Sequence, residues 1–288
     1  MNKIESAARS VDSRFLNGLL NSRFADVARD LLPESAKRKL RQIVHGEKGR
    51  YPLQEPVIVC LAGQEARFWI RNHSDWYRIT TENFEGDYGH ILIKTLTDMD
   101  RPDFVDVGSA QGYYSILAAK AGSRVVSIDP DPISQNSLQE NLLLNPELED
   151  NVKVMGIALG EKPGKMRLYI DKSGTYAPSL RKTVRGLKDV MEVQVTTMDV
   201  LVFDGIIPSP DVVKIDVEGA EGLVVSGMQG ILSSAEKPKN IFIELHRTYL
   251  PRFGTTETEV ADNITKNGYT LQNRWERRNE MLCHFTSK

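Results

Sequence analysis

Apolar positions change their spacing along the 288-residue chain, and each spacing predicts a different kind of element. In residues 11–32 they recur every three or four positions, which predicts an amphipathic helix that ends at Pro33. Its apolar stripe consists of Val11, Phe15, Leu16, Leu19, Leu20, Phe24, Val27, Leu31 and Leu32. We expect this stripe to pack on the main domain or on a second copy in a homodimer. Peripheral membrane contact is the alternative, because the basic residues Lys37, Arg38, Lys39 and Arg41 follow the helix.

Short runs of β-branched and aromatic residues between Val57 and Thr81 predict a small antiparallel unit. The runs are VIVCL, ARFWI and WYRIT, and they are separated by Gly63 and by the polar stretch 72–75. We therefore expect a helical accessory segment over residues 1–55 and a small antiparallel and helical cap over residues 56–100. Residues 101–288 form the main domain in this interpretation.

After Arg101 and Pro102, short apolar runs alternate with helical stretches, which predicts a parallel sheet covered by helices on both faces. The expected strands are Phe104–Val107, Arg124–Ile128, Val152–Ile157, Val212–Asp216 and Ile241–Leu245. Two last runs, Tyr269–Trp275 and Met281–Phe285, predict a hairpin that puts one antiparallel strand on the edge of the sheet. The predicted fold class is therefore α/β.

Composition excludes several classes of protein. The chain is 26% charged and 40% hydrophobic with a net charge of −2, which predicts a soluble globular protein and argues against a nucleic-acid partner. The charge is uneven, because the first fifty residues carry a surplus of five positive charges and the remainder a surplus of seven negative ones. Cys60 and Cys283 are too few for a disulfide framework, and no apolar stretch approaches the ~20 residues that span a bilayer. We expect a cytoplasmic protein.

Candidate ligand-binding residues follow the first two strands of the expected parallel sheet. The first strand runs into a turn of small residues, Asp106 to Gly112, and a helix begins at Tyr113. Small residues let the backbone approach a ligand, and ligands of open parallel sheets bind beyond the carboxyl ends of the strands. Asp129 ends the next strand 21 residues after Gly108, close to the ~20-residue offset of an acid that binds ribose hydroxyls. These features favour a nucleoside ligand, whereas the missing third glycine disfavours a nicotinamide oxidoreductase.

Candidate catalytic residues follow the fourth and fifth strands. The string KIDVEGAE places Lys214, Asp216, Glu218 and Glu221 at one strand end, and His246 follows the next strand. Such a cluster suits proton transfer, because neighbouring charges shift the pKa of each group. It also suits a divalent cation such as Mg²⁺ that holds two adjacent hydroxyls of a substrate. Helix capping by Glu218 and Glu221 is the purely structural alternative.

Together these strings resemble the FkbM family of S-adenosylmethionine-dependent methyltransferases. The resemblance runs from about Asp103 to Gly268, and its marks are DVGSAQGYYS, the turn Asp129–Pro132, the step Thr197–Asp199, KIDVEGAE and IFIELH. It implies a Rossmann-like class I methyltransferase fold, with a seven-stranded, mostly parallel sheet and an antiparallel C-terminal hairpin. It also implies S-adenosyl-L-methionine as the cofactor.

The resemblance implies positions for the parts of the cofactor. The methionine part lies at the glycine turn, the ribose at Asp129 and the adenine near Ala158, while Asp216 faces both cofactor and acceptor. The implied cofactor-binding residues are Asp106, Gly108, Ser109, Ala110, Gly112, Tyr113, Asp129, Ala158 and Asp216. Two departures stand out. The usual Gly-Ala-Asn turn is replaced by Gly108-Ser109-Ala110-Gln111, and the usual ribose glutamate by the shorter Asp129.

The expected activity is O-methylation of a hydroxyl on a sugar, glycan or natural product. His246 or one of the carboxylates Asp216, Glu218 and Glu221 takes the hydroxyl proton, and Lys214 tunes the cluster. A non-catalytic protein that binds S-adenosylmethionine is the alternative, which the intact KIDVEGAE string disfavours. An acidic or lipid-linked sugar suits the aromatic and basic residues of two expected acceptor regions, Trp69, Trp76 and Tyr77, and Tyr176, Arg181, Lys182, Arg185 and Lys188 within segment 173–188. Packing in the core is the favoured alternative for Trp69.

Overall fold

The structure, a computed structural model, describes residues 56–71, 75, 79, 87–171, 187–277 and 279–287. All of them belong to one unit of the chain, Leu53–Lys288. The amphipathic helix expected over residues 11–32 and the basic residues after it lie outside the described residues, so the surface that it covers remains a prediction. In the part of the chain that the structure describes, no helix has both the length and the apolar character needed to cross a membrane.

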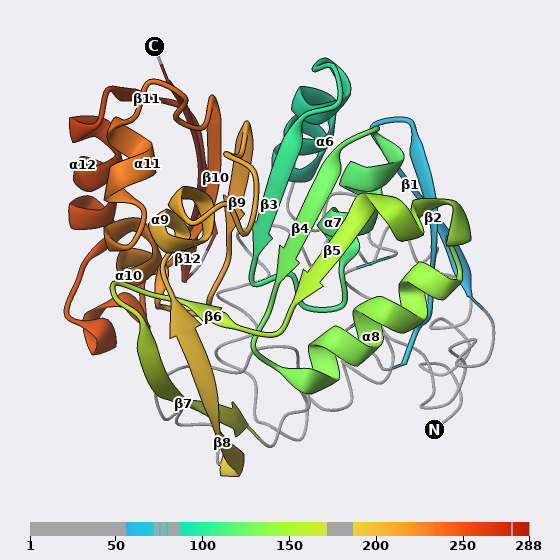
Figure 1. The fold of residues 1–288 in the computed structure, drawn as a ribbon, viewed down its shortest axis with the longest axis horizontal. Helices are drawn as coiled ribbons and strands as arrows, with labels where there is room; N and C mark the ends of the chain where they lie inside the picture. The colour runs from blue at the N-terminus through green and yellow to red at the C-terminus, as the bar shows by residue number, and fades with distance from the viewer. Residues whose placement is uncertain are drawn as a thin grey trace, which may run out of the picture. The chain divides into compact units, whose positions relative to one another are not determined.

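A seven-stranded sheet in the order β11-β12-β10-β9-β3-β4-β5 forms the centre of the fold (Figure 1). The strands are β3 (Asp103–Val107), β4 (Arg124–Ile128), β5 (Val152–Met155), β9 (Val212–Ile215), β10 (Asn240–His246), β11 (Tyr269–Glu276) and β12 (Glu280–Ser287). Strands β5, β4, β3, β9 and β10 pair in parallel, and β12 pairs antiparallel with both β10 and β11. The expected α/β fold, with a mostly parallel sheet of seven strands and an antiparallel C-terminal hairpin, is confirmed.

The expected place of the antiparallel strand is wrong. The antiparallel strand β12 lies inside the sheet, between β10 and β11, and β11 is the edge strand. Burial explains this order, because Met281, Leu282, Cys283 and Phe285 of β12 are all buried whereas most of β11 is exposed or half-buried. The more apolar strand of the hairpin therefore takes the position with neighbours on both sides.

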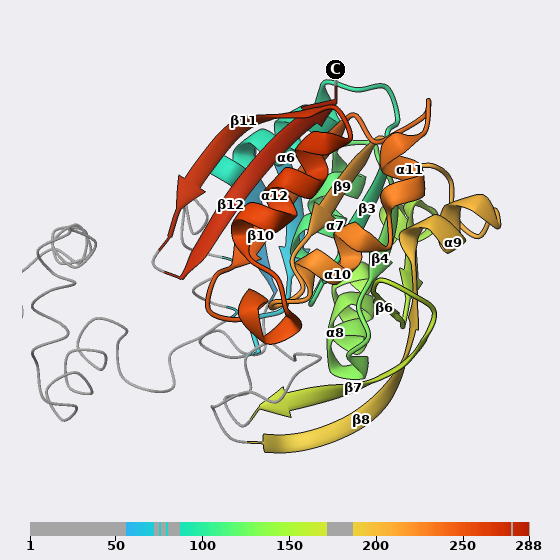
Figure 2. The same ribbon diagram turned by 90° about the vertical axis from the view of Figure 1, so that its left-hand side faces the viewer.

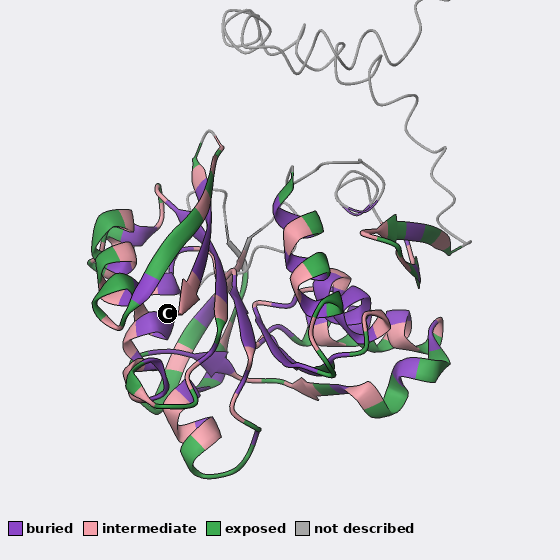
Figure 3. Ribbon diagram, turned by 90° about the horizontal axis from the view of Figure 1, so that it is seen from above, coloured by how far each residue is buried: buried purple, intermediate pink, exposed green. Residues whose placement is uncertain are grey.

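Helices cover both faces of the sheet (Figure 2). One face carries α6 (Asp87–Thr97) and α7 (Tyr113–Lys120), and the other carries α9 (Met198–Phe203), α10 (Glu221–Ser226), α11 (Gln229–Ser233) and α12 (Glu257–Lys266). Helix α8 (Pro132–Leu143) and the 3-10 helix η1 (Pro146–Asn151) connect β4 to β5, and η2 (Leu250–Phe253) follows β10. The central strands are buried along most of their length (Figure 3).

Alternation along β10 sends its side chains to two different environments. Ile241, Ile243 and Leu245 belong to the apolar core that also contains buried residues of α9–α12. Phe242 lies on the opposite face, where its ring contacts that of Tyr88 from α6 with centroids 5.6 Å apart. Glu244 and His246 follow Phe242 at the same alternation and therefore lie on the α6 and α7 face, at the carboxyl end of the strand.

The small antiparallel unit is a hairpin of β1 (Val57–Leu61) and β2 (Gln64–Phe68). Its turn consists of Ala62 and Gly63, both with positive φ, the backbone form that closes tight hairpins. This confirms the strands expected from VIVCL and ARFWI. The third expected strand, WYRIT, is wrong at Ile79, the one residue of that run that the structure describes, because Ile79 is helical.

A second sheet of three strands, in the order β6-β8-β7, was not expected from the sequence. It consists of β6 (Ala158–Leu159), β7 (Gly164–Asp171) and β8 (Leu187–Thr196), and the β7–β8 hairpin extends beyond the central sheet (Figure 1). Leu168, Val193 and Val195 bury one face of it. Residues 172–186, which carry Tyr176, Arg181, Lys182 and Arg185 of the expected acceptor region, lie outside the described residues, while Lys188 belongs to β8.

The turn between β3 and α7 packs directly against the end of β9. Gly108 and Gly112 have φ angles of +81° and +83°, a backbone conformation that residues other than glycine rarely adopt. The Gly108 amide donates to the carbonyl of Ile128 (2.8 Å), and a Cβ atom at residue 108 would overlap the backbone carbonyl oxygen of Asp216. The glycine is therefore required by both backbone conformation and close approach.

Replacing Gly108 by alanine tests this close approach. Alanine in the left-handed region costs about 1 to 2 kcal/mol, and the overlap with Asp216 adds about 1 to 3 kcal/mol. We expect Gly108→Ala to lower the free energy of unfolding by about 3 kcal/mol or more in urea denaturation. Gly122→Ala is the matched control, because Gly122 has φ +94° with no atom within 4 Å of an added Cβ. Equal losses in the two variants would contradict the packing argument.

The buried His284 of β12 contributes stability that is lost in acid. Its Nε2 atom contacts Asn240 Oδ1 at 2.9 Å, its ring stacks on Phe242 at 4.1 Å, and burial lowers its pKa from 6.5 to about 4. The folded chain therefore favours neutral His284, so this stability is present above pH 6.5 and is lost as the pH falls toward 4. We expect this contribution of His284 to the free energy of unfolding to drop by on the order of 1 to 2 kcal/mol from pH 7 to pH 5.

The urea midpoints of three chains at both pH values measure this effect. Between pH 7 and pH 5 the stability of the unchanged chain should fall relative to that of His284→Gln, because glutamine has no proton to take up. His90→Gln should show the same change as the unchanged chain, because His90 is exposed on α6. An equal pH dependence in His284→Gln and in the unchanged chain would contradict the role of His284.

Candidate active site

The polar residues expected at the site meet at the carboxyl edge of the central sheet. Strand β3 ends in the glycine turn, β4 ends before Asp129, β9 ends before Asp216, and β10 ends in His246. Because β3, β4, β9 and β10 pair in parallel, their carboxyl ends lie at the same edge. The fold therefore places the two candidate groups, a ligand turn and an acid cluster, side by side.

Asp129 joins the two loops that flank the turn. Its Oδ2 atom accepts the Ala110 amide (2.9 Å) and its Oδ1 atom accepts the Asp131 amide (2.9 Å). Burial raises the pKa of Asp129 to about 7, although these two backbone hydrogen bonds lower it. Each carboxylate oxygen has a second lone pair, so Asp129 keeps the capacity to accept two ligand hydroxyls.

A buried polar row lies beneath the turn. Ser115 Oγ donates to Asp106 Oδ2 (2.7 Å), and the Lys214 ammonium lies 3.9 Å from Asp106 Oδ1 and 3.2 Å from Asp216 Oδ2. Burial raises the pKa of Asp106, and the Lys214 charge opposes this rise. Lys214 therefore neutralises carboxylates of both β3 and the loop after β9, which links the turn to the acid cluster.

Two buried acceptors beside the turn have no hydrogen-bond partner, namely Asp106 Oδ1 and Gln111 Oε1. A buried acceptor without a donor is costly, and such atoms in native sites commonly await a ligand or water. An ammonium or hydroxyl group of a ligand would supply the missing donor. The turn therefore fits a ligand that carries such donors near its small residues.

His246 is held in place by Glu221, a fully buried carboxylate at the start of α10. Glu221 Oε1 lies 2.7 Å from His246 Nδ1 and accepts the Gly219 amide at 2.9 Å. The buried carboxylate accepts the Nδ1 proton, which leaves Nε2 as the second ring nitrogen. Glu221 does more than cap a helix, because the carboxylate that accepts the Gly219 amide also orients the imidazole of His246.

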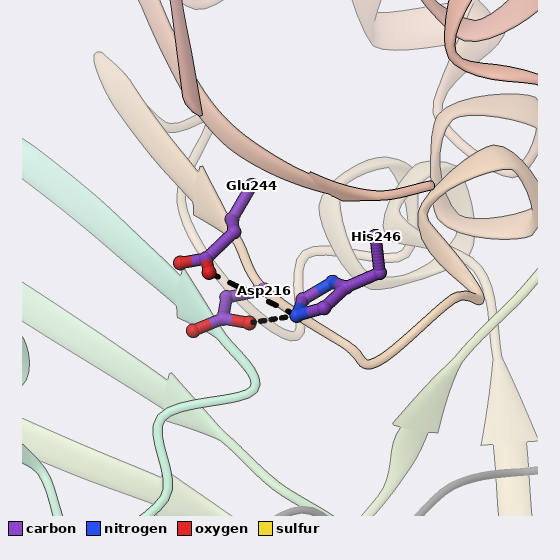
Figure 4. A group of neighbouring side chains, drawn as sticks. All are labelled: Asp216, Glu244 and His246. Atoms are coloured by element: carbon purple, nitrogen blue, oxygen red, sulfur yellow. Dashed lines mark ion pairs between the residues drawn. The ribbon is translucent and has the colours of Figure 1, made fainter. Parts of the chain in front are cut away.

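Three further carboxylates surround the Nε2 atom of His246, and Figure 4 shows two of them, Asp216 and Glu244. Its distances to Glu218 Oε2, Asp216 Oδ1 and Glu244 Oε1 are 3.7, 3.8 and 3.8 Å. Burial by itself lowers the pKa of His246, but the Glu221 carboxylate, together with Glu218 and Asp216, raises it well above 6.5. The imidazole therefore favours its protonated form in the chain without ligand.

The loop after β9 carries backbone strain at the cluster. Glu218 has φ +53° and Gly219 φ +106°, and a non-glycine residue in the left-handed region is uncommon. A Cβ atom at Gly219 would lie 2.5 Å from Tyr249 Cβ, so this loop packs directly on the segment after β10. Strain of this kind often accompanies function, because packing must hold the loop in an unfavourable form.

The sequence located most members of this cluster but not all. Lys214, Asp216, Glu218, Glu221 and His246 come together as expected. Glu244 joins them from within β10, and Arg277 Nη1 lies 3.7 Å from Glu244 Oε1. The string Glu244-Leu245-His246 brings Glu244 to this edge from the sequence alone, without assigning it a role. Arg277 was not a predicted site residue, because it reaches the site only through the pairing of β12 with β10.

Other predicted site residues lie elsewhere. Ala158, expected near adenine, is buried in an apolar cluster with Leu168, Val193 and Val195. Trp69 is half-buried, and its amide donates to Asn141 Oδ1 on α8 at 2.9 Å. Trp76 and Tyr77 lie outside the described residues. The sequence-based assignment of these aromatic residues to the acceptor remains a prediction.

Asp216, Glu244 and His246 each offer one donor atom, and these atoms lie within 4.8 Å of one another. Two carboxylates and an imidazole are ligands for several divalent ions. The same three side chains are drawn in Figure 4, where they converge from the ends of β9 and β10. The geometry is therefore compatible with either a proton-transfer cluster or a cation site.

Comparisons with known proteins identify relatives of this arrangement. A curated relative, the hexuronic acid methyltransferase AglP of Haloferax volcanii, is 26% identical over 220 residues, which cover 74% of this chain and 85% of AglP. A crystal structure of a methyltransferase FkbM from Methylobacillus flagellatus is 18% identical, with a TM-score of 0.44 over 65% of this chain and 44% of that one. An S-adenosylmethionine-dependent methyltransferase structure from Agrobacterium tumefaciens is 10% identical, with a TM-score of 0.48 over 83% and 72% of the two chains.

A family model, the methyltransferase FkbM domain, matches residues 106–271. The matched range begins at the turn after β3 and ends within β11, so it contains every residue of the acid cluster except Arg277. It leaves the nicotinamide oxidoreductase alternative without support. The chain belongs to the FkbM methyltransferase family and is an S-adenosylmethionine-dependent methyltransferase.

Proposed function

We propose that the chain transfers a methyl group from S-adenosylmethionine to a hydroxyl oxygen of a sugar that contains a uronic acid. The sugar class is supported by the similarity to AglP, a hexuronic acid methyltransferase. The choice of a hydroxyl is supported by the acid cluster, since a neutral hydroxyl needs a base and meets less repulsion from carboxylates than an anionic oxygen does. The observation that carries the proposal is the His246–Glu221 pair beside the ligand turn.

The turn after β3 suits the cofactor. Asp106 and Gln111 offer buried acceptor atoms without a hydrogen-bond partner, and Gly108 and Gly112 keep the turn free of side chains. Asp129 would accept the two ribose hydroxyls. The bound cofactor supplies an electrophilic methyl group on a sulfonium. Ser109, Ala110, Tyr113 and Asp216 complete the proposed set, whereas the burial of Ala158 in an apolar cluster gives no support to its proposed place beside adenine.

His246 is the proposed general base. Glu221 fixes the Nδ1 side of the ring, so the acceptor proton is taken at Nε2. Glu218, Asp216 and Glu244 lie 3.7 to 3.8 Å from Nε2 and stabilise the imidazolium that forms. Lys214 compensates Asp106 and Asp216, so the carboxylates stay charged beside the base.

The proposal also includes a cytoplasmic location for the protein and, as a variant, attachment of the acceptor to a lipid. Cys60 is exposed on β1 and Cys283 is buried on β12, and both are free thiols, which is compatible with a reducing cytoplasm. A homodimer and peripheral membrane contact would involve residues 11–41, which lie outside the described residues. A lipid-linked glycan would involve the acceptor regions expected around Trp69 and within segment 173–188, most of which also lie outside the described residues.

The His246→Gln variant tests the base. We expect kcat to fall by about 10²- to 10³-fold with a sugar acceptor, because general-base catalysis contributes at this scale. The dissociation constant for S-adenosylhomocysteine, measured by calorimetry, should change less than about twofold, since the neutral variant keeps the cofactor turn. His90→Gln on the exposed side of α6 is the matched control and should retain kcat.

The pH profile separates the base from its orienting carboxylate. Because the surrounding carboxylates raise the pKa of His246 above 6.5, kcat should increase with pH, and Glu221→Gln should move this rise to lower pH. An unchanged profile would remove Glu221 from the proposed role.

The stability of the product in mild alkali tests which oxygen is methylated. A methyl group that mild alkali releases would belong to a carboxylate ester. Methylation of a carboxylate needs no general base, so this product would refute hydroxyl methylation.

A divalent cation bound by Asp216, Glu244 and His246 is the second candidate, favoured by the closeness of their donor atoms. In that arrangement Asp216, Glu244 and His246 would hold the ion, and the ion rather than the imidazole would supply the acidification of the hydroxyl. We expect EDTA to leave the initial rate within about twofold of the untreated enzyme, because the His246–Glu221 pair needs no metal. Loss of turnover with EDTA, restored by Mg²⁺ or Mn²⁺, would favour the cation and exclude His246 as the base.

A further inference from the structure

The segment that follows β10 places an aromatic ring and a guanidinium beside the proposed base. The Tyr249 ring lies nearly parallel to the His246 imidazole, with centroids 6.1 Å apart and an interplanar angle of 19°. The guanidinium carbon of Arg252 lies 5.0 Å from the centroid of the Tyr249 ring. Neither residue was a predicted site residue, and neither belongs to the acid cluster.

Arg252 differs from the other arginines of this region in its partners. Arg247 is paired with Glu257 and Glu276, and Arg277 lies within ion-pair distance of Glu244 and Glu280. Among the residues that the structure describes, no carboxylate pairs with Arg252, and its ring contact with Tyr249 holds the side chain in place. A half-buried guanidinium without a carboxylate keeps its planar set of donors available for an anionic ligand.

The backbone fixes this pair relative to the acid cluster. The Tyr249 amide donates to the His246 carbonyl (2.8 Å), and the Arg252 amide donates to the Tyr249 carbonyl (2.9 Å). On its other side Tyr249 packs against Gly219, the neighbour of Glu218. The pair is therefore part of the wall of the proposed active site and not of a distant surface.

We propose that Tyr249 and Arg252 form the acceptor subsite, in which the tyrosine ring stacks on a pyranose and the guanidinium binds its carboxylate. This inference rests on the proposed function and extends it to the feature of the acceptor that is recognised. The carboxylates around His246 repel an acidic sugar, so binding needs a cation at the edge of the cluster. Arginine suits this role, because its donors match the two oxygens of a carboxylate.

Equilibrium binding tests the subsite without turnover. The full chain loaded with S-adenosylhomocysteine is titrated with methyl glucuronide and with methyl glucoside, which differ only in the carboxylate. We expect the glucuronide to bind about 10- to 100-fold more tightly, the scale of one charge-assisted hydrogen-bonded pair. Arg252→Gln should remove most of this preference, Arg252→Lys should keep part of it, and Tyr249→Leu should weaken both sugars.

Arg101→Gln is the matched control, because Arg101 is an exposed arginine that precedes β3, at the opposite end of the strand from the glycine turn. Arg101→Gln should leave the affinities for both sugars within about twofold of those of the unchanged chain. Arg252→Gln should likewise leave the affinities for the glucoside and for S-adenosylhomocysteine within about twofold. A wild-type chain without preference for the glucuronide, or a preference that survives in Arg252→Gln, overturns the subsite. Methyl transfer to a hydroxyl of the glucuronide would still support the proposed function in that case, whereas absence of transfer to any uronic acid sugar would refute the proposed function itself.

Discussion

The contact between the glycine turn and the end of β9 determines the arrangement of everything at the carboxyl edge. Because Gly108 has no side chain, its Cα approaches the backbone carbonyl of Asp216, and the ligand turn and the KIDVEGAE loop become one wall. Lys214 holds the same two segments from beneath, through Asp106 and Asp216. A larger residue at position 108 would separate the turn from the acid cluster. The positions of Asp129 and of the segment after β10 follow from this contact through their hydrogen bonds and packing.

Charge balance explains why so many carboxylates can lie together. Asp106, Asp216, Glu218, Glu221 and Glu244 are buried or half-buried near one another, and Lys214, His246 and Arg277 lie among them. Isolated carboxylates would protonate in such a place, but Lys214 and His246 each lie within ion-pair distance of at least two of them, and Arg277 lies within ion-pair distance of Glu244. The fully buried Glu221 depends most on its partners, the imidazole and the Gly219 amide. The cluster is therefore a network, and removing one member changes the protonation of the others.

The sequence predicted the parallel strands well and the later β-structure poorly, for a physical reason. A strand buried on both faces, such as β10 with its consecutive apolar residues Ile241–Ile243, is a short apolar run that carries its own signal. The position of β12 depends on whether β11 or β12 pairs with β10, and the local sequence pattern does not determine this choice. Strand β8 alternates in the run Val193 to Thr196, but its burial depends on β7 and on Ala220 of a distant loop. Site residues that follow strands were found, whereas Arg277 across the hairpin depends on register.

The same carboxylates that hold His246 set a condition on its use as a base. They raise its pKa well above 6.5, which favours the protonated imidazole in the chain without ligand and so opposes its use as a base. A cation placed next to the cluster stabilises the carboxylates and weakens their hold on that proton, which lowers the pKa of His246 again. S-adenosylmethionine carries its positive charge at the sulfonium, which in the proposed arrangement would lie beside the turn that contacts Asp216. The imidazole is therefore better able to accept a proton in the cofactor complex than in the free chain, and proton removal is coupled to the presence of the methyl donor.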